Sequence, residues 1–159
     1  MRKNLIIMLL CLPAWLSAEQ LYLAINGLSY HFDRTKNYNE TNLGYGLEFD
    51  IPLDDTWIGF VAGGTFRDSN NQDSNYLATG GKYRIPLSSD RDGLYLDLGL
   101  GGMFMTRYDY HNNNPFFVAG PFLSMGNKYM ALNMVYLPNI NPKFKPLVYV
   151  QIMFSLIEF

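Results

Sequence analysis

A histidine, an aspartate and a serine in this 159-residue chain have the chemical types needed to act on an ester. His31 ends one strand-like segment, and Asp68 and Ser69 follow another. In acyl transfer a histidine takes a proton, a carboxylate orients the histidine and a hydroxyl is activated, so the three types form one set. Serine and aspartate are also common in loops, so the residues alone leave both catalysis and a plain polar loop open.

These residues can meet only if the segments that carry them end at one edge of a single fold. After residue 18, apolar side chains alternate with small or polar ones in eight stretches separated by Gly, Pro, Asn and Asp. In residues 93–107, leucines occupy one face while Tyr95, Asp97, Gly99 and Gly101 occupy the other. The stretches predicted as strands are 20–31, 43–52, 56–66, 75–86, 93–107, 115–125, 128–138 and 146–159.

The outward leucines and the loop lengths favour a membrane barrel. Strands of about ten residues, apolar on one face, cross a bilayer at a tilt. The connections alternate between long and short, as in outer-membrane barrels, and Phe159 ends the chain directly after a strand. A soluble sandwich or a lipocalin-like barrel is the alternative, but it would not place leucine on its outer face. We predict an all-β fold, an eight-stranded antiparallel transmembrane β-barrel with a narrow lumen.

The N-terminal segment predicts export. Arg2 and Lys3 precede an apolar run that ends at Leu16-Ser17-Ala18, the pattern of a secretory signal peptide over residues 1–18. The single cysteine, Cys11, would leave with it, so residues 19–159 form one cysteine-free barrel domain. That domain has ten basic and fourteen acidic residues and no basic tract, which excludes nucleic acid as a partner. We expect no metal and no cofactor.

Two features of the barrel bear on a site. With the N-terminus in the periplasm, the first and third strands both end outside, so His31, Asp68 and Ser69 can meet at the outer rim. Glycines fill no volume, and they recur at positions expected to face inward. They leave either a slim lumen suited to a hydrocarbon chain or relief of crowding in a small barrel. The inward glycines are Gly44, Gly46, Gly80, Gly99 and Gly101.

Several short motifs follow one another along the chain after residue 18. They are Tyr30-His31, Tyr38-Asn39-Glu40 before a Gly-rich strand, Phe66-Arg67-Asp68-Ser69, the LGLGG run, Thr106-Arg107, Pro121 and Val135-Tyr136-Leu137-Pro138. In order and approximate spacing these motifs resemble the outer-membrane lipid A palmitoyltransferase family (PagP), and the resemblance covers most of the chain after residue 18. Asn26 and Asn42 stand where that family has a second pair of prolines.

The resemblance implies a role for several residues. The family's catalytic histidine, aspartate and serine correspond to His31, Asp68 and Ser69. Its paired prolines, which interrupt the sheet so that a lipid can enter sideways, correspond to Pro121 and Pro138. The glycine at the floor of its acyl-chain pocket corresponds to Gly80. Separately, the planar guanidinium of Arg107 at the outside end of the fifth strand could hold a phosphate, although a rim arginine is as often simply solvated.

The activity implied by the resemblance is transfer of a palmitoyl chain from a glycerophospholipid to lipid A in the outer leaflet of the Gram-negative outer membrane. The partners would be a phospholipid donor and a lipid A acceptor, the rim would face the cell exterior, and we expect a monomer. Two other functions remain open. One is an ester hydrolase that uses the same rim, and the other is a non-catalytic structural or binding barrel.

Overall fold

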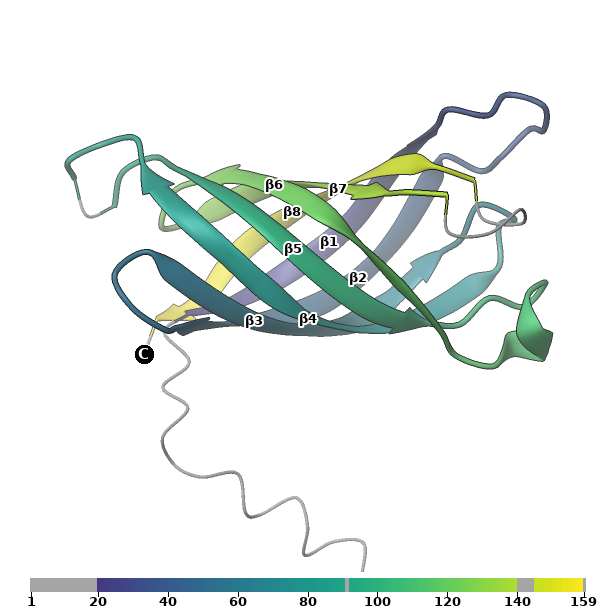
Figure 1. Ribbon diagram of the computed structural model, residues 1–159, viewed down its shortest axis with the longest axis horizontal. Coiled ribbons are helices and arrows are strands. Elements are labelled where there is room, and N and C mark those ends of the chain that lie inside the picture. The colour runs from purple at the N-terminus through teal and green to yellow at the C-terminus, as the bar shows by residue number, and fades with distance from the viewer. Residues whose placement is uncertain (1–19, 91, 140–144, 159) are drawn as a thin grey trace, which may run out of the picture.

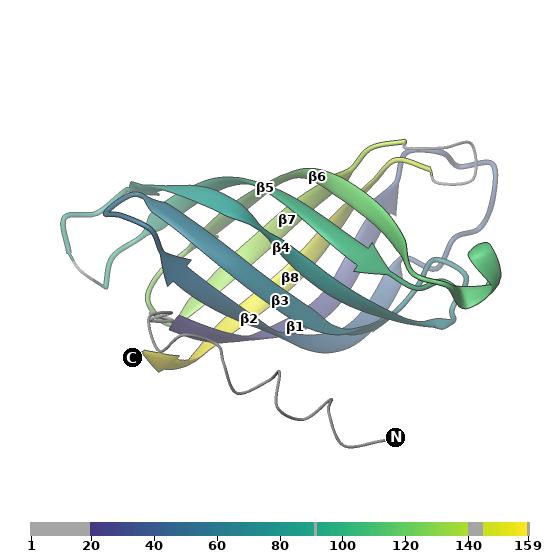
Figure 2. The ribbon, with the colours of Figure 1, turned by 60° about the horizontal axis from the view of Figure 1, so that its bottom comes forward.

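The eight predicted segments are strands, and they close into one antiparallel barrel (Figures 1 and 2). The computed structural model describes residues 20–90, 92–139 and 145–158, so the expected signal peptide and Cys11 lie outside the described residues. Every predicted strand boundary lies within two residues of the observed one. The strands are β1 (Gln20–His31), β2 (Thr41–Pro52), β3 (Trp57–Arg67), β4 (Asp73–Pro86), β5 (Tyr95–Met105), β6 (Phe116–Gly126), β7 (Met130–Leu137) and β8 (Leu147–Glu158).

Pairing of the first strand with the last closes the barrel. β1 runs antiparallel to β8 from the pair Gln20–Glu158 to the pair His31–Leu147, and each other strand pairs with its sequence neighbours. The turns that join β2 to β3, β4 to β5 and β6 to β7 gather at the left end of Figure 1, beside the C-terminus. The loops that join β1 to β2, β3 to β4 and β5 to β6 gather at the other end, and the last of them contains a 3-10 turn, η2 (His111–Asn113).

The barrel wall is apolar outside and polar inside. Leu77 and Leu100 point outward with 62% and 69% of their surface exposed, whereas Lys82 and Asp97 point inward and are at most 1% exposed. A closed sheet with this orientation is stable only when lipid covers its outer face. None of the helical segments in the described part of the chain is long and apolar enough to cross a membrane.

A β-bulge in β1 sets the direction of His31. The register of β1 shifts between Asn26 and Leu28 on both of its neighbours. Against β8, two residue steps of β1 oppose one, so Gly27 is the extra residue there, whereas against β2 two steps of β1 oppose three. Before the bulge the buried positions are even-numbered, and after it Ser29 and His31 are buried. Because side chains alternate along a strand, a regular β1 would turn His31 toward the lipid. The glycine that interrupts the sequence pattern is therefore what points the histidine into the lumen.

The turn end of the lumen is filled by charges that pair with each other. Lys82 Nζ lies 3.0 Å from Glu48 Oε1 and 2.8 Å from Asp50 Oδ2. Arg84 makes a two-pronged contact with Asp97, with both N–O distances at 2.9 Å. Ion pairs of this kind satisfy buried charges and leave little free volume.

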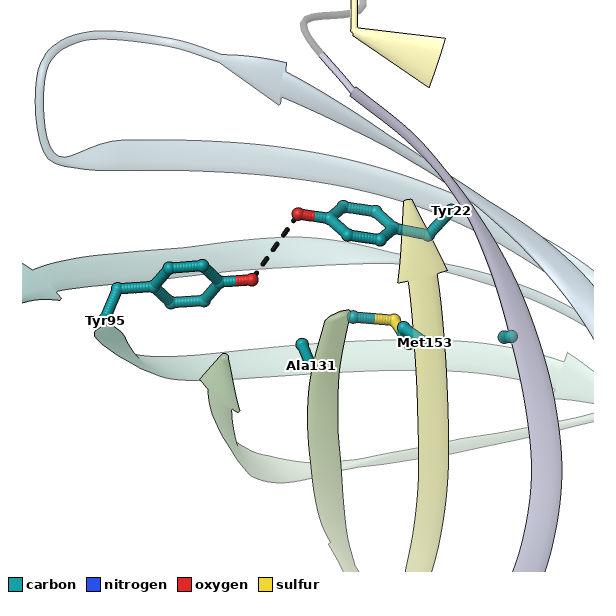
Figure 3. Close-up of a cluster of buried hydrophobic side chains, with 5 residues drawn as sticks. Tyr22, Tyr95, Ala131 and Met153 are labelled. Atoms are coloured by element: carbon teal, nitrogen blue, oxygen red, sulfur yellow. Dashed lines mark hydrogen bonds between the residues drawn. The ribbon is translucent and has the colours of Figure 1, made fainter. Parts of the chain in front are cut away.

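Two tyrosines and small apolar residues pack beside these charges. The Tyr22 and Tyr95 hydroxyls point toward one another, 3.4 Å apart, next to Ala131 and Met153 (Figure 3). The Arg84 guanidinium lies 3.8 Å from the centre of the Tyr95 ring, so the aromatic and charged groups form one packed layer.

Replacing Lys82 with methionine tests this layer. Lys82→Met leaves Glu48 and Asp50 as buried carboxylates without their cation, so we expect the free energy of unfolding to fall by about 3 kcal/mol or more. Urea unfolding of the barrel in phospholipid vesicles measures the change. Lys128→Met is the matched control, because Lys128 pairs with Asp92 at 3.2 Å in a more exposed turn and should cost under about 1 kcal/mol. Equal losses in the two variants would contradict the assigned role of Lys82.

Candidate active site

His31 and Ser69 meet at the loop end of the lumen. His31 Nε2 and Ser69 Oγ are 2.8 Å apart, a hydrogen bond between the end of β1 and the loop that follows β3. The His31 side chain is 2% exposed, and its ring stacks on Tyr38 with the centroids 4.3 Å apart and the planes 14° from parallel. The bond and the stack together fix the orientation of the imidazole.

Asp68 shapes the turn that carries Ser69. Its Oδ1 accepts hydrogen bonds from the backbone N–H groups of Asn70, at 2.8 Å, and Gln72, at 2.9 Å. Asn71 has a φ of 62°, a left-handed conformation that asparagine tolerates better than most residues, and this allows the turn to close. The second carboxylate oxygen, Oδ2, lies 3.7 Å from Nε of Arg107. Asp68 is thus near the histidine in the fold, but its carboxylate is engaged elsewhere.

Glu40 is the carboxylate that faces the other ring nitrogen of His31. Its Oε1 lies 3.6 Å from His31 Nδ1, and it accepts hydrogen bonds from the His31 backbone N–H at 2.9 Å and from Arg34 Nη1 at 2.9 Å. The His31 backbone N–H and the Arg34 guanidinium lower the pKa of Glu40 below its usual range, so this carboxylate is ionised at neutral pH.

Two asparagines tie the first loop to the Ser69 loop. The backbone N–H of Asn39 donates to the Ser69 carbonyl at 2.8 Å, and the Asn39 side chain donates to the Asp68 carbonyl at 3.0 Å. The Asn42 side chain donates to the Arg67 carbonyl at 2.7 Å. These bonds come from the residues just before and at the start of β2, and they hold Ser69 against His31.

An apolar cavity of about 140 Å³ opens beneath the His31–Ser69 pair. Phe66, Tyr76 and Tyr149 narrow its upper part. Phe60 and Phe122 close it below in an edge-to-face pair, with ring centroids 5.5 Å apart at 90°. The cavity therefore runs from the rim residues down the lumen to the two aromatic rings, where Glu48 of the charged layer also lines it.

The inward glycines make room for these rings. A Cβ on Gly80 would lie 2.7 Å from the Phe60 ring, and one on Gly99 would collide with the Phe122 ring. A Cβ on Gly101 would lie 3.2 Å from Phe60. The sequence leaves two interpretations of these glycines, a slim lumen or relief of crowding, and each holds in part. The glycines relieve crowding around the Phe60 and Phe122 rings, and a cavity remains above those rings. Gly80 lies behind Phe60, which itself forms the cavity floor.

The cavity wall is not equally closed on all sides. The ladder between β6 and β7 stops at the pair Phe122–Val135, so the part of β6 that holds Pro121 has no registered partner on β7, and Pro138 directly follows β7. Among the described strands, β5 and β6 by contrast pair along the full length of both. Ala119, Gly120 and Leu137 line the cavity beside this unpaired part of the wall.

Arg107 lies at the cavity mouth and contacts two carboxylates. It is 14% exposed, with Nε 3.7 Å from Asp68 Oδ2 and a terminal nitrogen 3.1 Å from Asp109 Oδ2. Its position at the mouth is as predicted, and its charge is partly balanced within the protein. Within the described ranges, no group of three or more His, Cys, Asp or Glu side chains could hold a metal ion.

Comparison with known families agrees with this geometry. The model of the family described as "Antimicrobial peptide resistance and lipid A acylation protein PagP" matches residues 15–150. The chain belongs to this family. Its members include a protein of Proteus mirabilis (strain HI4320) named "Lipid A acyltransferase PagP", which is 28% identical over 114 residues. That match covers 71% of this chain and 53% of the relative, so the chain spans about half the length of the curated relative it matches.

Two solved structures are similar in outline. Both are of the Yersinia pestis outer-membrane protein Ail, one in a phospholipid bilayer nanodisc and one in a crystal. The nanodisc structure has 8% sequence identity and a TM-score of 0.47, and the match covers 87% of this chain and 99% of Ail. The crystal structure has 10% identity and a TM-score of 0.44, and covers 86% and 95%.

In this PagP family member, the sequence predicts that His31 and Ser69 meet, as they do, but it does not predict the groups that hold them. His31 and Ser69 were brought together by the expected strand directions. Glu40 and Asn39 were visible only as part of a motif before β2, and nothing in their spacing revealed which groups they would contact. The sequence feature that could have pointed to Glu40 and Asn39 is the short polar run they belong to, because the loop from β1 to β2 must pass over the rim.

Loss of the Asn39 side chain should loosen the Ser69 loop. Asn39→Ala removes the 3.0 Å bond to the Asp68 carbonyl, worth about 1 kcal/mol, together with two bonds to the Thr41 backbone at the start of β2. Only the first of these reaches the Ser69 loop, so we expect trypsin to cut after Arg67 roughly fivefold faster. Mass spectrometry of the fragments measures the rate. Asn70→Ala, in the same loop but exposed, is the control and should leave the rate within twofold of native. An unchanged rate in Asn39→Ala would show that this bond does not restrain the loop.

Proposed function

We propose that this protein transfers a palmitoyl chain from a glycerophospholipid to lipid A in the outer leaflet of the outer membrane. The observation that carries the proposal is the 2.8 Å bond between His31 Nε2 and Ser69 Oγ at the mouth of an apolar cavity. Family membership supports lipid A acylation as the reaction, and the curated relative carries the name of a lipid A acyltransferase. The active rim would face the cell exterior.

The rim supplies the groups for chemistry on an ester. His31 acts as the general base through Nε2, and Ser69 is either the nucleophile or the hydrogen-bond donor to the reacting ester. Asp68 contributes by building the turn that presents Ser69, as its bonds to the Asn70 and Gln72 N–H groups support. Arg107, beside Asp68 at the mouth, is placed to attract the phosphate of a lipid head group.

The lumen suits the acyl chain of the donor. Eight residue steps along β3 separate Asp68 at the rim from Phe60 at the floor. At ~3.3 Å per residue and a strand tilt of ~40°, the cavity is about 20 Å deep, enough for a long chain laid straight. The unpaired part of the wall between β6 and β7, flanked by Pro121 and Pro138, offers the chain a route from the bilayer into the cavity.

Lipid A analysis in cells tests the activity and the rim together. Gram-negative cells that lack their own palmitoyltransferase, expressing this protein, should contain lipid A with a palmitoyl-sized mass gain. At matched membrane levels, Ser69→Ala should reduce that gain by about a hundredfold or more, because general-base catalysis has lost its partner. Mass spectrometry of extracted lipid A gives both results.

A correctly inserted native protein that adds no mass would contradict the proposed transfer. Free fatty acid released in those cells would instead indicate an ester hydrolase that uses the same rim. A mass gain that persists in Ser69→Ala would retain the activity and remove Ser69 from the site.

Chain-length choice should depend on the floor behind Phe60. Gly80→Met would press on the β5 backbone at Leu100 and Gly101 and on the Phe60 ring, so β4 and β5 must move apart and the ring must move toward the cavity. In the correctly inserted variant we expect the preferred donor chain to shorten by two or more carbons. Each methylene that loses its burial costs about 0.8 kcal/mol, so palmitoyl transfer should fall at least about tenfold relative to the shorter chain. Competition between donors of mixed chain length, read by mass spectrometry, measures the preference.

Gly81→Met is the matched control for this experiment. Gly81 is the next residue of β4 and faces the opposite side of the sheet, where an added Cβ comes no closer than 3.9 Å to its neighbours. This variant should keep the native chain-length profile. An identical profile for Gly80→Met and the native protein would exclude Gly80 from the control of chain length.

A further inference from the structure

We propose that Glu40, rather than Asp68, is the carboxylate that positions His31 for proton transfer, so that Ser69, His31 and Glu40 act as one set. This inference rests on the proposed function. It goes beyond it by assigning a positioning role to a residue of the first loop that contacts the ring from the side opposite Ser69.

The two nitrogens of the His31 ring face different partners. Nε2 lies 2.8 Å from Ser69 Oγ, and it can accept a proton there only if the ring carries its own proton on Nδ1. Nδ1 is buried, has no hydrogen-bond partner within the described residues, and lies 3.6 Å from Glu40 Oε1. A catalytic bond is often long in the absence of substrate and tightens in the complex. Glu40 is therefore placed to select the reactive tautomer.

The competing carboxylate is held by its own turn. One oxygen of Asp68 accepts two backbone N–H groups of that turn, and the other, buried and without a hydrogen-bond partner within the described residues, lies 3.7 Å from Nε of Arg107. Turning this carboxylate toward His31 would break the turn that presents Ser69. Asp68 thus supports the nucleophile side of the pair, and the base side is left to Glu40.

Glu40 is held in place by the residue it would position. Its Oε1 accepts the backbone N–H of His31 at 2.9 Å, so the carboxylate and the imidazole are fixed to the same point of the backbone. Arg34 donates to the same oxygen at 2.9 Å, and its guanidinium lies over the Tyr30 ring. This arrangement keeps the carboxylate beside Nδ1 although the side chain is 33% exposed.

The proton balance of the step requires no further group. The proton leaves a hydroxyl oxygen for Nε2, the electron pair of the broken O–H bond forms a bond from that oxygen to the ester carbonyl carbon, and the ring becomes a cation. The bond from that carbon to the glycerol oxygen then breaks, and the glycerol oxygen takes the proton from Nε2. If the attacking hydroxyl is that of Ser69, the same two steps follow once more, with the lipid A hydroxyl attacking the acyl group and the Ser69 oxygen taking the proton back. Glu40 stays ionised throughout and stabilises the cation across Nδ1.

Charge removal at constant shape tests the proposal. Glu40→Gln keeps an oxygen for the His31 N–H and removes the negative charge. The charged groups that act on the ring are Glu40, Arg34 and Arg107, with the Tyr38 ring stacked on it. Loss of the one anion in this set disfavours the imidazolium, so His31 should titrate lower in Glu40→Gln, by about one pH unit.

The titration is followed by NMR on the full barrel in detergent micelles, without substrate. The His31 ring signal is assigned by its loss in His31→Asn, since His111 is the only other histidine. Transfer is measured with radiolabelled dipalmitoyl phosphatidylcholine and lipid A over a range of pH. We expect the plateau rate of Glu40→Gln to fall at least about tenfold, with the acid limb of its pH profile displaced to lower pH.

Two matched variants separate the carboxylates. Asp33→Asn, in the same loop, removes an acid that bonds Lys145 and the Thr35 backbone, and it should keep the native titration and pH profile. Asp68→Asn should lower the rate through the Ser69 turn while moving the His31 titration less than Glu40→Gln does.

The inference is overturned if His31 in Glu40→Gln titrates as in the native protein, or if Asp68→Asn moves the titration further. It is also overturned if Glu40→Gln transfers palmitate at the native rate. Failure of the proposed function has a different signature, because the native protein would then transfer no chain in any variant while the titration still reports whether Glu40 and His31 are coupled.

Discussion

The rest of the structure depends on the closed hydrogen-bonded ladder of the barrel. Lipid offers no partners to backbone N–H and C=O groups, so a sheet can cross a membrane only if its first and last strands pair. Here β1 and β8 do so along their full length. Closure with eight strands leaves an interior only wide enough for side chains and a slim cavity. Both the candidate site and its cavity must therefore be built from residues that point inward.

Alternation along each strand sets which side chains point inward, and one irregularity sets the direction of His31. The bulge at Gly27 changes the phase of β1 and turns His31 into the lumen, where the loop after β3 can bring Ser69 to it. Below, charges that would be intolerable in lipid pair within the lumen, as Lys82 does with Glu48 and Asp50. The charged layer and the Phe60–Phe122 floor together give the cavity a closed end.

The strands and the rim could be predicted because they follow a period of two and the direction of successive strands. Gly27 interrupts the alternation of apolar residues in 20–31, but the sequence does not show whether this glycine weakens β1 or forms a bulge, because that depends on how β1 pairs with β2 and β8. The partner of His31 Nδ1 could not be predicted either. Asp68 and Glu40 are both carboxylates at the rim, and only the fold of their loops decides that Asp68 bonds its own turn while Glu40 reaches the ring.

The cavity wall is paired unequally on its two sides. The β6–β7 ladder stops at Phe122, and beyond it backbone N–H and C=O groups have no partner on the neighbouring strand, which is costly in a water-free membrane core. Pro121 and Pro138 have no backbone N–H, so they reduce the number of unpaired donors there. The wall formed by β1, β2 and β3 has additional bonds instead. Asn26 of β1 and Asn42 of β2 donate side-chain hydrogen bonds to the carbonyls of Thr65 and Arg67 on β3. The wall that lacks pairing thus contrasts with the wall that has additional bonds, and the latter is the one that carries His31 and Glu40. Because the orientation of His31 depends on its hydrogen bond to Ser69, the histidine is better placed on the wall with the additional bonds.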